Sequence, residues 1–291
     1  MNAHLEKLRD LTIAFVGAGS IAEALIKGVS ETGVGHVARL RVVNRKNRER
    51  LAYLQATYSV QTSQCIHDAV HDANVVVLCV KPKDIVESLA QAAQHAKPDT
   101  LYLSVVAGCS LESMRKLIVA TNPTHSNPHI VRAMPNTSCA VRQSATAFAM
   151  TTSCSARDRD WTESILDSVG KSYPIAEHLI NAVTGLAGSG PAYVYYLVEA
   201  MTLAGIDVGL SEEDASALVI QTLFGAAHML RSTAESPTTL RERVTSPGGT
   251  TFAGISTLKL HHFEESIRQA VISATKRSAE LGAELSTHVH V

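Results

Sequence analysis

Aromatic residues are scarce in this sequence, at 4% of its 291 positions, and only one of them is tryptophan. Few aromatic side chains leave little material for a surface on which nucleic-acid bases could stack. Neither sign of charge dominates, because 26 lysines and arginines stand against 27 aspartates and glutamates. The resulting net charge of −1 gives no electrostatic reason to expect nucleic acid or an anionic membrane as a partner.

Long apolar runs are missing as well. The longest run covers little more than residues 75–80, whereas a membrane-spanning helix needs roughly 18–20 apolar residues. The opening segment, MNAHLEKLRD, is charged and has no apolar stretch, so we expect no secretory signal peptide. The five cysteines are odd in number and form no CxxC pair, and no HExxH motif occurs. These absences predict reduced thiols, a cytoplasmic location and no metal site.

The sequence does contain ample material for a hydrophobic core, with 45% hydrophobic and 18% charged residues. In its first half, short β-branched runs alternate with helical patterns. Strands are expected at 12–16, 40–43, from Val60, 74–80, 100–106, 129–132 and 145–150, with helices at 20–31, 45–58, 84–95 and 111–119. This alternation predicts an α/β fold, an N-terminal Rossmann doubly wound parallel sheet with right-handed crossovers.

The pattern changes after residue 155. An amphipathic helix is expected at 157–169, and no strand is expected from Glu177 onward. Helices are expected instead at 177–186, 191–204, 212–231, 237–244, 251–258 and 263–281. We therefore place the domain boundary near 170–177, with a Rossmann domain of residues 1–174 and an all-helical domain of residues 175–291.

A glycine-rich turn follows the first predicted strand and opens the first predicted helix. It reads Gly17-Ala18-Gly19-Ser20-Ile21-Ala22, the GxGxxA form of the dinucleotide fingerprint. The first glycine makes the tight turn, the second lets the backbone approach a pyrophosphate, and the small third residue lets helix and strand pack closely. An ordinary βα turn would also use two glycines, but the strand before and the helix after favour dinucleotide binding.

The end of the second predicted strand bears on which dinucleotide is bound. An acidic residue there would bind the ribose hydroxyls of NAD, but this chain has Asn44-Arg45-Lys46, with Arg48 and Arg50 beyond. No carboxylate is available at the end of this strand, and a guanidinium can bind a 2′-phosphate bidentately. We therefore predict NADPH as the preferred cofactor, read by Asn44 and Arg45, with NADH as an alternative. A solvated basic helix start would explain the same residues without a ligand.

Two further strand ends are expected along the same edge, because ligands of open α/β sheets bind outside the carboxyl ends of the strands. These are Val80-Lys81-Pro82 and Val105-Val106-Ala107. Lys81 is the only ionisable residue among them. A charge that positions a phosphate or carboxylate is favoured over a catalytic proton donor.

A second glycine-rich segment lies in the helical half. Ser246-Pro247-Gly248-Gly249 is a predicted loop, and Thr250-Thr251 begin a predicted helix. Successive amides at a helix N-terminus make an anion site, and hydroxyls add neutral donors and acceptors, so a small carboxylate substrate would fit. N-capping by Ser246 or Thr250 explains part of the pattern without a substrate.

In their order along the chain, these motifs resemble those of pyrroline-5-carboxylate reductases. The resemblance runs over about residues 12–281, and its most specific segments are VKP (80–82), SVVAG (104–108), RAMPNT (132–137), AVTGLAGSGPAY (182–193) and VTSPGGTT (244–251). It implies a Rossmann domain followed by an all-α substrate-binding and dimerisation domain. The assembly would be a homodimer or a decamer of dimers. The implied activity is the NAD(P)H-dependent reduction of 1-pyrroline-5-carboxylate to L-proline, the last step of proline biosynthesis.

The resemblance also implies roles for single residues. The implied cofactor contacts, beside the Arg45 inferred above, are Gly17, Ala18, Gly19, Ser20, Ile21, Asn44, Val80, Lys81, Pro82, Val105, Val106 and Ala107. The implied substrate contacts are Glu177, Thr250 and Thr251, beside Ser246, Gly248 and Gly249 inferred above from the loop. We assign the substrate carboxylate to the loop amides and its ring nitrogen to the Thr251 hydroxyl, the candidate catalytic group. Three positions depart from the family pattern, which usually has Asp at Asn181, Ser at Ala187 and a neutral residue at Arg243.

Two rival functions remain. A β-hydroxyacid dehydrogenase has the same two-domain layout, but it would need a catalytic lysine in the first long helix of the second domain, where this chain reads GSGPAYVYYLVEAM. A NADP-sensing module that has lost catalysis would have no need of the complete Ser-Pro-Gly-Gly-Thr-Thr loop. Substrate-dependent oxidation of NADPH separates all three functions.

Overall fold

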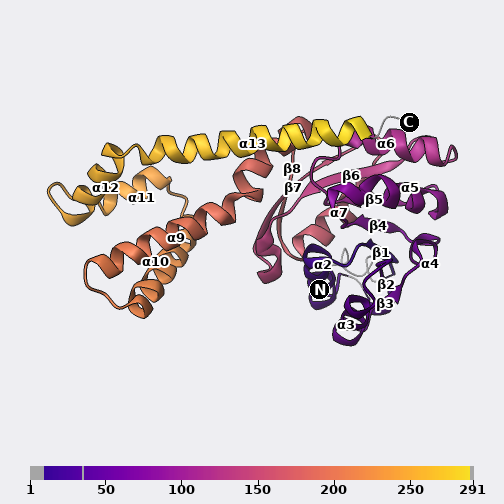
Figure 1. The fold of residues 1–291 in the computed structure, drawn as a ribbon, viewed down its shortest axis with the longest axis horizontal. Coiled ribbons are helices and arrows are strands. Elements are labelled where there is room, and N and C mark those ends of the chain that lie inside the picture. The colour runs from indigo at the N-terminus through magenta and orange to yellow at the C-terminus, as the bar shows by residue number, and fades with distance from the viewer. Residues whose placement is uncertain (1–9, 35, 289–291) are drawn as a thin grey trace. The chain divides into compact units, whose positions relative to one another are not determined.

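A computed structural model describes residues 10–34 and 36–288 of the chain (Figure 1). Eight strands form one sheet: β1 (Ile13–Val16), β2 (Leu40–Val43), β3 (Gln61–Ser63), β4 (Val75–Leu78), β5 (Leu101–Ser104), β6 (His129–Met134), β7 (Ser144–Met150) and β8 (Gly170–Pro174). Their order across the sheet is β3-β2-β1-β4-β5-β6-β7-β8. Strands β1 to β6 are parallel in the order of a Rossmann fold, which confirms the predicted fold class.

The far edge of the sheet differs from the all-parallel prediction. Strand β7 runs antiparallel to β6, and β8 pairs with β7 in parallel. The link between β6 and β7 contains only a short turn of 3₁₀-helix at Thr137–Val141 (η3), and a connection of this length allows antiparallel pairing but not a parallel crossover. Strand β8 was not predicted from the sequence, because it is a half-exposed edge strand that reads GKSYP and shows no apolar alternation.

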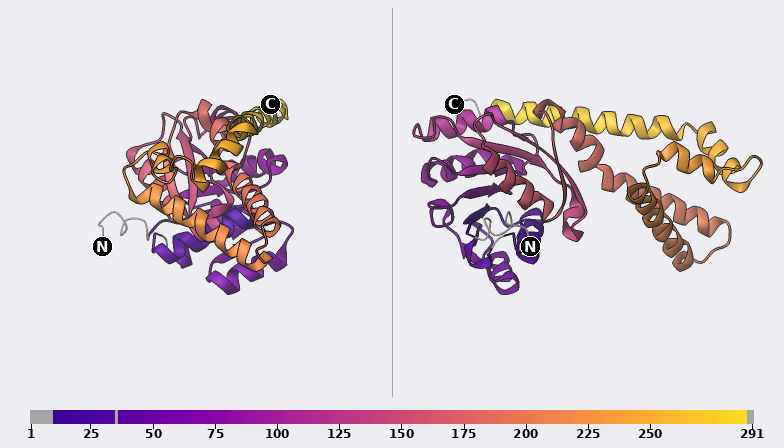
Figure 2. Two further views of the ribbon diagram at one scale, coloured as in Figure 1. Left: turned by 90° about the vertical axis from the view of Figure 1, so that its left-hand side faces the viewer. Right: turned by 180° about the vertical axis from the view of Figure 1, so that it is seen from behind.

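Helices cover both faces of this sheet (Figures 1 and 2). They are α2 (Ser20–Thr32), α3 (Arg48–Tyr58), α4 (Ile66–Val70), α5 (Ile85–His95), α6 (Leu111–Thr121), α7 (Ala156–Asp167) and α8 (Ile180–Val183). One apolar cluster joins α2, α3 and α7 to the sheet, and a second joins α4, α5, α6 and α8 to its other face. Alternate residues of β1 divide between the two clusters, Ile13 and Phe15 in the first and Ala14 and Val16 in the second.

The rest of the chain is helical, as predicted. Its α-helices are α9 (Gly190–Asp207), α10 (Glu212–Ser232), α11 (Pro237–Arg243), α12 (Thr250–Leu260) and α13 (Phe263–His288). Short helical turns occur at Val37–Arg39 (η1), Pro82–Asp84 (η2), Glu177–Leu179 (η4) and Thr184–Gly188 (η5), the last being a π-helix. In the part of the chain that the structure describes, none of the helices combines the length and the apolar character that a membrane crossing needs.

The chain divides into two compact units that differ from the predicted domains. Among the described residues, unit 1 contains 10–34, 36–188 and 273–288, and unit 2 contains 189–272. The segment after β8 belongs to unit 1, since Ile180 is buried in the second apolar cluster. The C-terminal part of α13 also belongs there: the Ser278 hydroxyl donates to Asn181 at 3.1 Å, and a Cβ on Gly282 would lie 3.3 Å from the carbonyl oxygen of Gly108. The boundary at 174/175 stays a prediction.

Candidate active site

The carboxyl ends of β1, β2 and β4 meet at a cavity of about 370 Å³ in unit 1. Gly17 follows β1 directly, has a φ of +106°, and its amide donates to the carbonyl of Val43 at 3.0 Å. A Cβ on Gly17 would lie 2.5 Å from the carbonyl oxygen of Cys79, so both the backbone angle and the space require glycine. A Cβ on Gly19 would meet nothing within 4 Å, which leaves open space beside the backbone.

Helix α2 begins at this cavity with no side chain capping its first amides. Gly19 is the N-cap residue, so the first N–H groups of the helix are free to bind phosphate oxygens. Ala22, the small residue of the fingerprint, is fully buried against the sheet. The open space at Gly19 and the uncapped helix start fit the pyrophosphate of a dinucleotide.

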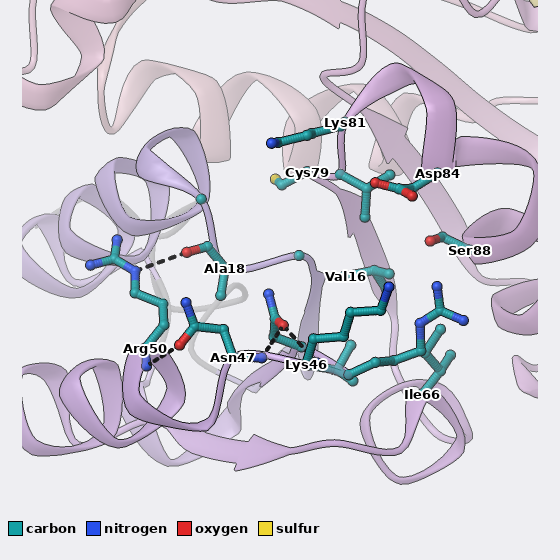
Figure 3. Close-up of a pocket in the computed structure, with 16 residues that line it drawn as sticks. Val16, Ala18, Lys46, Asn47, Arg50, Ile66, Cys79, Lys81, Asp84 and Ser88 are labelled. Carbon is teal, nitrogen blue, oxygen red and sulfur yellow. Dashed lines mark hydrogen bonds between the residues drawn. The ribbon is translucent and has the colours of Figure 1, made fainter.

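Sixteen residues line the cavity (Figure 3): Val16, Gly17, Ala18, Gly19, Val43, Asn44, Arg45, Lys46, Asn47, Arg50, Ile66, Cys79, Val80, Lys81, Asp84 and Ser88. Seven of the predicted cofactor contacts are among them: Gly17, Ala18, Gly19, Asn44, Arg45, Val80 and Lys81. Six predicted contacts do not line it. Ser20 and Pro82 adjoin lining residues in the chain, Ile21 follows Ser20, and Val105, Val106 and Ala107 follow β5. All of these roles stay predictions.

The segment after β2 is a turn, although the sequence predicted a helix from residue 45. The side-chain oxygen of Asn44 accepts hydrogen bonds from the amides of Lys46 and Asn47, at 3.1 and 2.9 Å. Asn47 is the N-cap, accepting from the amide of Arg50 at 2.8 Å, so α3 begins at Arg48. Asn44 therefore shapes the cavity wall through its own backbone neighbours.

Arg50 joins two parts of this wall. Its Nε donates to the carbonyl of Ala18 at 2.9 Å, and its guanidinium pairs with Glu23 of α2. Tyr53 and Tyr58 of α3 donate to the same carboxylate at 2.9 and 3.0 Å. Burial and the hydrogen bond to Glu23 raise the pKa of Tyr58 to about 12. These contacts hold α3 against the glycine-rich turn.

Arg45 is paired with an acidic residue that sequence reasoning missed. Both of its terminal nitrogens donate to the carboxylate of Glu87 on α5, the second at 2.8 Å. The sequence has no carboxylate at the end of β2, but the fold supplies one from 42 residues further along the chain. The pair with Arg45 holds the pKa of Glu87 below its usual value.

The opposite side of the cavity carries Lys81 and Cys79, while the Lys46 side chain extends along the side facing them (Figure 3). Lys81 is the N-cap of the short turn η2, which leads into α5. Burial raises the pKa of the Cys79 thiol, so this side chain adds no negative charge to the wall. Val105 and Val106 continue the neighbouring strand end, and the Val106 amide donates to the Ser104 hydroxyl at 3.3 Å.

The glycine-rich loop of unit 2 is a turn followed directly by a helix. Gly248 has a φ of +71°, and the amide of Gly249 donates to the carbonyl of Ser246 at 3.0 Å. With Pro247 before the glycine, this is the pattern of a type II turn. Helix α12 begins at Thr250 with no side-chain cap, so neither Ser246 nor Thr250 caps it as the simpler interpretation required. Its first amides and the exposed hydroxyls of Thr250 and Thr251 remain open to a ligand.

Glu177 lies in unit 1, where its carboxylate already has two donors. The amide of Leu111, the first residue of α6, donates to it at 2.7 Å, and the mostly buried guanidinium of Arg132 at 3.3 Å. A carboxylate at a helix N-terminus is stabilising, so this arrangement has a structural explanation. The role of Glu177 toward a substrate stays a prediction. Arg243, a departure from the family pattern, donates to Glu235 at 2.7 Å.

Several lining residues have no signal in the sequence. Ile66 and Ser88 belong to helices on one face of the sheet and look like ordinary helix positions. Asp84 and the neighbouring Glu87 follow the predicted strand end after β4, so only their position at the start of a helix could have drawn attention to them.

Comparison with known proteins agrees with this geometry. Residues 177–281 match a family model described as pyrroline-5-carboxylate reductase dimerisation, and residues 12–108 match one described as NADP oxidoreductase coenzyme F420-dependent. The chain is 41% identical over 286 residues to pyrroline-5-carboxylate reductase 2 of Bacillus subtilis, covering 95% of this chain and 99% of that protein. It is 38% identical to the pyrroline-5-carboxylate reductase of Pseudomonas aeruginosa, over 94% and 97% of the two chains.

The chain belongs to the pyrroline-5-carboxylate reductase family. A solved pyrroline-5-carboxylate reductase from Coxiella burnetii has the same fold, with a TM-score of 0.85 at 32% identity over 93% of this chain and 98% of that one. The family reduces 1-pyrroline-5-carboxylate to proline with NAD(P)H. The predicted family and fold class are thereby confirmed, and unit 2 lies within the dimerisation region of the family.

Proposed function

We propose that this chain catalyses the NADPH-dependent reduction of 1-pyrroline-5-carboxylate to L-proline, with NADH as an alternative donor. The observation that carries the proposal is the match to pyrroline-5-carboxylate reductases along almost the whole chain. The cavity behind Gly17 and the uncapped start of α12 support it, because they are suited to a dinucleotide and a small carboxylate.

In this mechanism unit 1 holds the cofactor, which supplies a hydride when bound. The amides at the start of α2 bind the pyrophosphate, and Gly17 keeps the turn close enough to the strand for them to do so. Asn44, Arg45 and Lys46 line the end of the cavity that takes the adenosine ribose. Lys81, on the opposite wall, adds a positive charge that attracts and positions anionic groups.

Unit 2 supplies the substrate contacts. The amides of Gly248, Gly249 and Thr250 bind the substrate carboxylate, as helix N-termini bind anions. The Thr251 hydroxyl accepts a hydrogen bond from the protonated ring nitrogen and so orients the ring carbon toward the hydride donor. The imine carbon receives the hydride and the electron pair of the C=N bond passes to nitrogen. The loop has no acidic residue, so the proton comes from solvent or arrives with the substrate as its iminium.

We also propose that the chain works in the cytoplasm as a homodimer whose interface buries more than about 2,000 Å², and that dimers associate into a decamer. The dimer is supported by the dimerisation region at 177–281. The cytoplasmic location is supported by the free thiols of all five cysteines, Cys65, Cys79, Cys109, Cys139 and Cys154. We propose 1–174 and 175–291 as the dinucleotide-binding domain and the substrate-binding, dimerising domain.

The activity is tested by following NADPH absorbance in the presence of 1-pyrroline-5-carboxylate and identifying the product. Oxidation of NADPH that depends on the imine and yields proline supports the proposal. Reduction of β-keto acids instead would favour a β-hydroxyacid dehydrogenase. Binding of NADPH without turnover of any of these substrates would favour a sensing module.

A further inference from the structure

The ion pair between Arg45 and Glu87 lies at the rim of the dinucleotide cavity. Arg45 follows β2 and lines the cavity, whereas Glu87 belongs to α5, does not line the cavity and contacts the Arg45 guanidinium. Both terminal nitrogens of the guanidinium donate to the two carboxylate oxygens, and Gln91 donates to one of those oxygens at 3.2 Å. Both terminal nitrogens of the Arg45 guanidinium are therefore already hydrogen-bonded to a carboxylate. A bidentate phosphate would need the same two donors.

We propose that the Arg45–Glu87 pair limits the preference for NADPH over NADH, because Glu87 competes with the 2′-phosphate for the two terminal nitrogens of Arg45. With an unphosphorylated ribose the pair stays closed. With a 2′-phosphate, Arg45 turns from Glu87 to the phosphate, and the carboxylate is left to solvent and to Gln91. This inference rests on the proposed function, in which the cavity binds a dinucleotide.

The other basic residues of this wall are placed differently. The Arg50 guanidinium is held by Glu23 and the Ala18 carbonyl, contacts that join α3 to the glycine-rich turn. Lys46 lines the cavity, and its positive charge acts on Glu87 together with that of Arg45. No hydrogen bond between Lys46 and Glu87 accompanies this attraction, whereas Arg45 donates two to the carboxylate. Arg45 is therefore the basic residue that has to exchange the Glu87 carboxylate for a phosphate.

The competition is mild, because the pair is partly exposed. The side chains of Arg45 and Glu87 are 37% and 55% exposed, so water and salt screen their attraction. Asp84 lines the same cavity and adds a second negative charge near Arg45. Removal of the Glu87 charge should therefore strengthen phosphate binding by about two- to five-fold, the range typical of exposed ion pairs.

Glu87→Gln tests this inference, since it keeps the shape of the side chain and removes its charge. The probes are adenosine 2′,5′-bisphosphate and AMP, whose dissociation constants are measured by calorimetry at low ionic strength. We expect the variant to bind the bisphosphate about two- to five-fold more tightly, with AMP unchanged. The ratio of kcat/KM for NADPH over NADH should rise by the same factor. In an Arg45→Ala background, Glu87→Gln should change neither the affinity ratio of the bisphosphate to AMP nor the kcat/KM ratio of NADPH to NADH.

The chain offers a matched control in Asp72→Asn. Asp72 accepts two hydrogen bonds from Arg41, the second at 3.1 Å, is 51% exposed, and does not line the cavity. This control should leave both ratios unchanged. Equal ratios in Glu87→Gln, Asp72→Asn and the unchanged protein would overturn the inference alone. Failure of the unchanged protein to bind either nucleotide or either cofactor would overturn the proposed function and the inference with it.

Discussion

The two units of this chain treat their apolar side chains in opposite ways. Unit 1 buries them in two clusters, one on each face of the sheet. In unit 2, where residues 189–272 are all described, only Ala215 and Val219 are buried. The large apolar side chains that unit 2 leaves exposed include Tyr195, Tyr196, Leu203, Leu218, Ile220, Phe224, Leu258 and Leu260.

This contrast concerns how much hydrophobic burial stabilises each unit within a single chain. Helices α9 and α10 do pack together, and a Cβ on Gly205 would lie only 2.9 Å from that of Ala215. A helix pair with apolar side chains on its outer faces still has much of its hydrophobic surface in water. Unit 1 completes its core within one chain, whereas unit 2 leaves many large apolar side chains exposed, in keeping with its match to a dimerisation region.

The largest effect is expected from charges placed in the exposed apolar surface of unit 2. Leu203→Glu combined with Phe224→Glu should produce an inactive monomer, because burying each unpaired carboxylate costs several kcal/mol. Sedimentation velocity at micromolar protein measures the assembly. The control is Val141→Glu in unit 1, a position that is 71% exposed and should leave the dimer intact. An active monomer of the double variant would show that unit 2 is stable alone.

Core substitution in unit 1 should act on folding and leave association unchanged. Leu25 of α2 is fully buried, so Leu25→Ala should lower the free energy of unfolding by about 2–5 kcal/mol. The dimer dissociation constant should stay the same. Leu203→Ala in unit 2 should do the reverse and weaken the dimer. Urea titration measures the free energy of unfolding of both variants, and sedimentation equilibrium measures their dimer dissociation constants. Equal changes of both quantities in the two variants would contradict the difference between the units.

The two glycines of the fingerprint should separate stability from binding. Gly17→Ala should weaken NADPH binding at least about ten-fold and lower the melting temperature, because it forces a strained φ, costing about 1–3 kcal/mol, and a backbone clash. Gly19→Ala should weaken NADPH binding but leave the melting temperature unchanged, since its Cβ meets no protein atom within 4 Å. Fluorescence titration and calorimetry measure the two quantities. A destabilised Gly19→Ala protein would contradict the assignment of that space to a ligand.

In unit 2, the Thr251 hydroxyl is expected to act on turnover. Thr251→Val keeps the shape of the side chain, and turnover should fall by about ten- to a hundred-fold, as for the loss of one hydrogen bond to a charged group. NADPH affinity should not change. The matched control is Thr257→Val in the same helix, whose hydroxyl donates to the Ala253 carbonyl. Normal turnover of Thr251→Val together with a lower melting temperature would assign Thr251 to the start of α12 alone.

The smallest effect concerns alkaline pH and unit 1. The pKa of Tyr58 is raised to about 12 from its ordinary value of 10.0 by burial and by its hydrogen bond to Glu23. A raised pKa favours the protonated phenol in the folded state, so its contribution is complete below pH 10 and is lost as pH rises toward 12. Tyr58→Phe should show a shallower loss of melting temperature over this range. Parallel curves for the two proteins would exclude Tyr58 as a cause.

Local patterns predicted most of unit 1. Buried strands such as 74–80 and the turn at Gly17 depend on short-range features, namely continuous apolar runs and a glycine at a special backbone angle. The start of α3 was predicted three residues early, because two asparagine turns outweigh the helical pattern there. The edge strand β8 carries no apolar pattern and is held by pairing with β7.

The least predictable part of the site is what the fold brings in from a distance. Arg45 could be identified from its position after β2. Its partner Glu87 could not, because no sequence pattern near Glu87 indicates that it lies beside the end of that strand. The same holds for Glu177, whose carboxylate is used by Leu111, 66 residues away. Ion pairs and caps between distant elements follow from three-dimensional packing, which no periodicity encodes.

The return of α13 to unit 1 has a consequence for how the protein is made. The backbone around Gly108 adjoins the strand end at 105–107, and Gly282 packs closely against it. After position 108 the ribosome adds 174 residues to reach position 282, at about 5–20 residues per second. For about 9–35 s the nascent sheet therefore exposes this loop without its covering helix. During synthesis the newly made nucleotide-binding half is incomplete at one edge, and a chaperone or a premature partner chain has that interval in which to reach it.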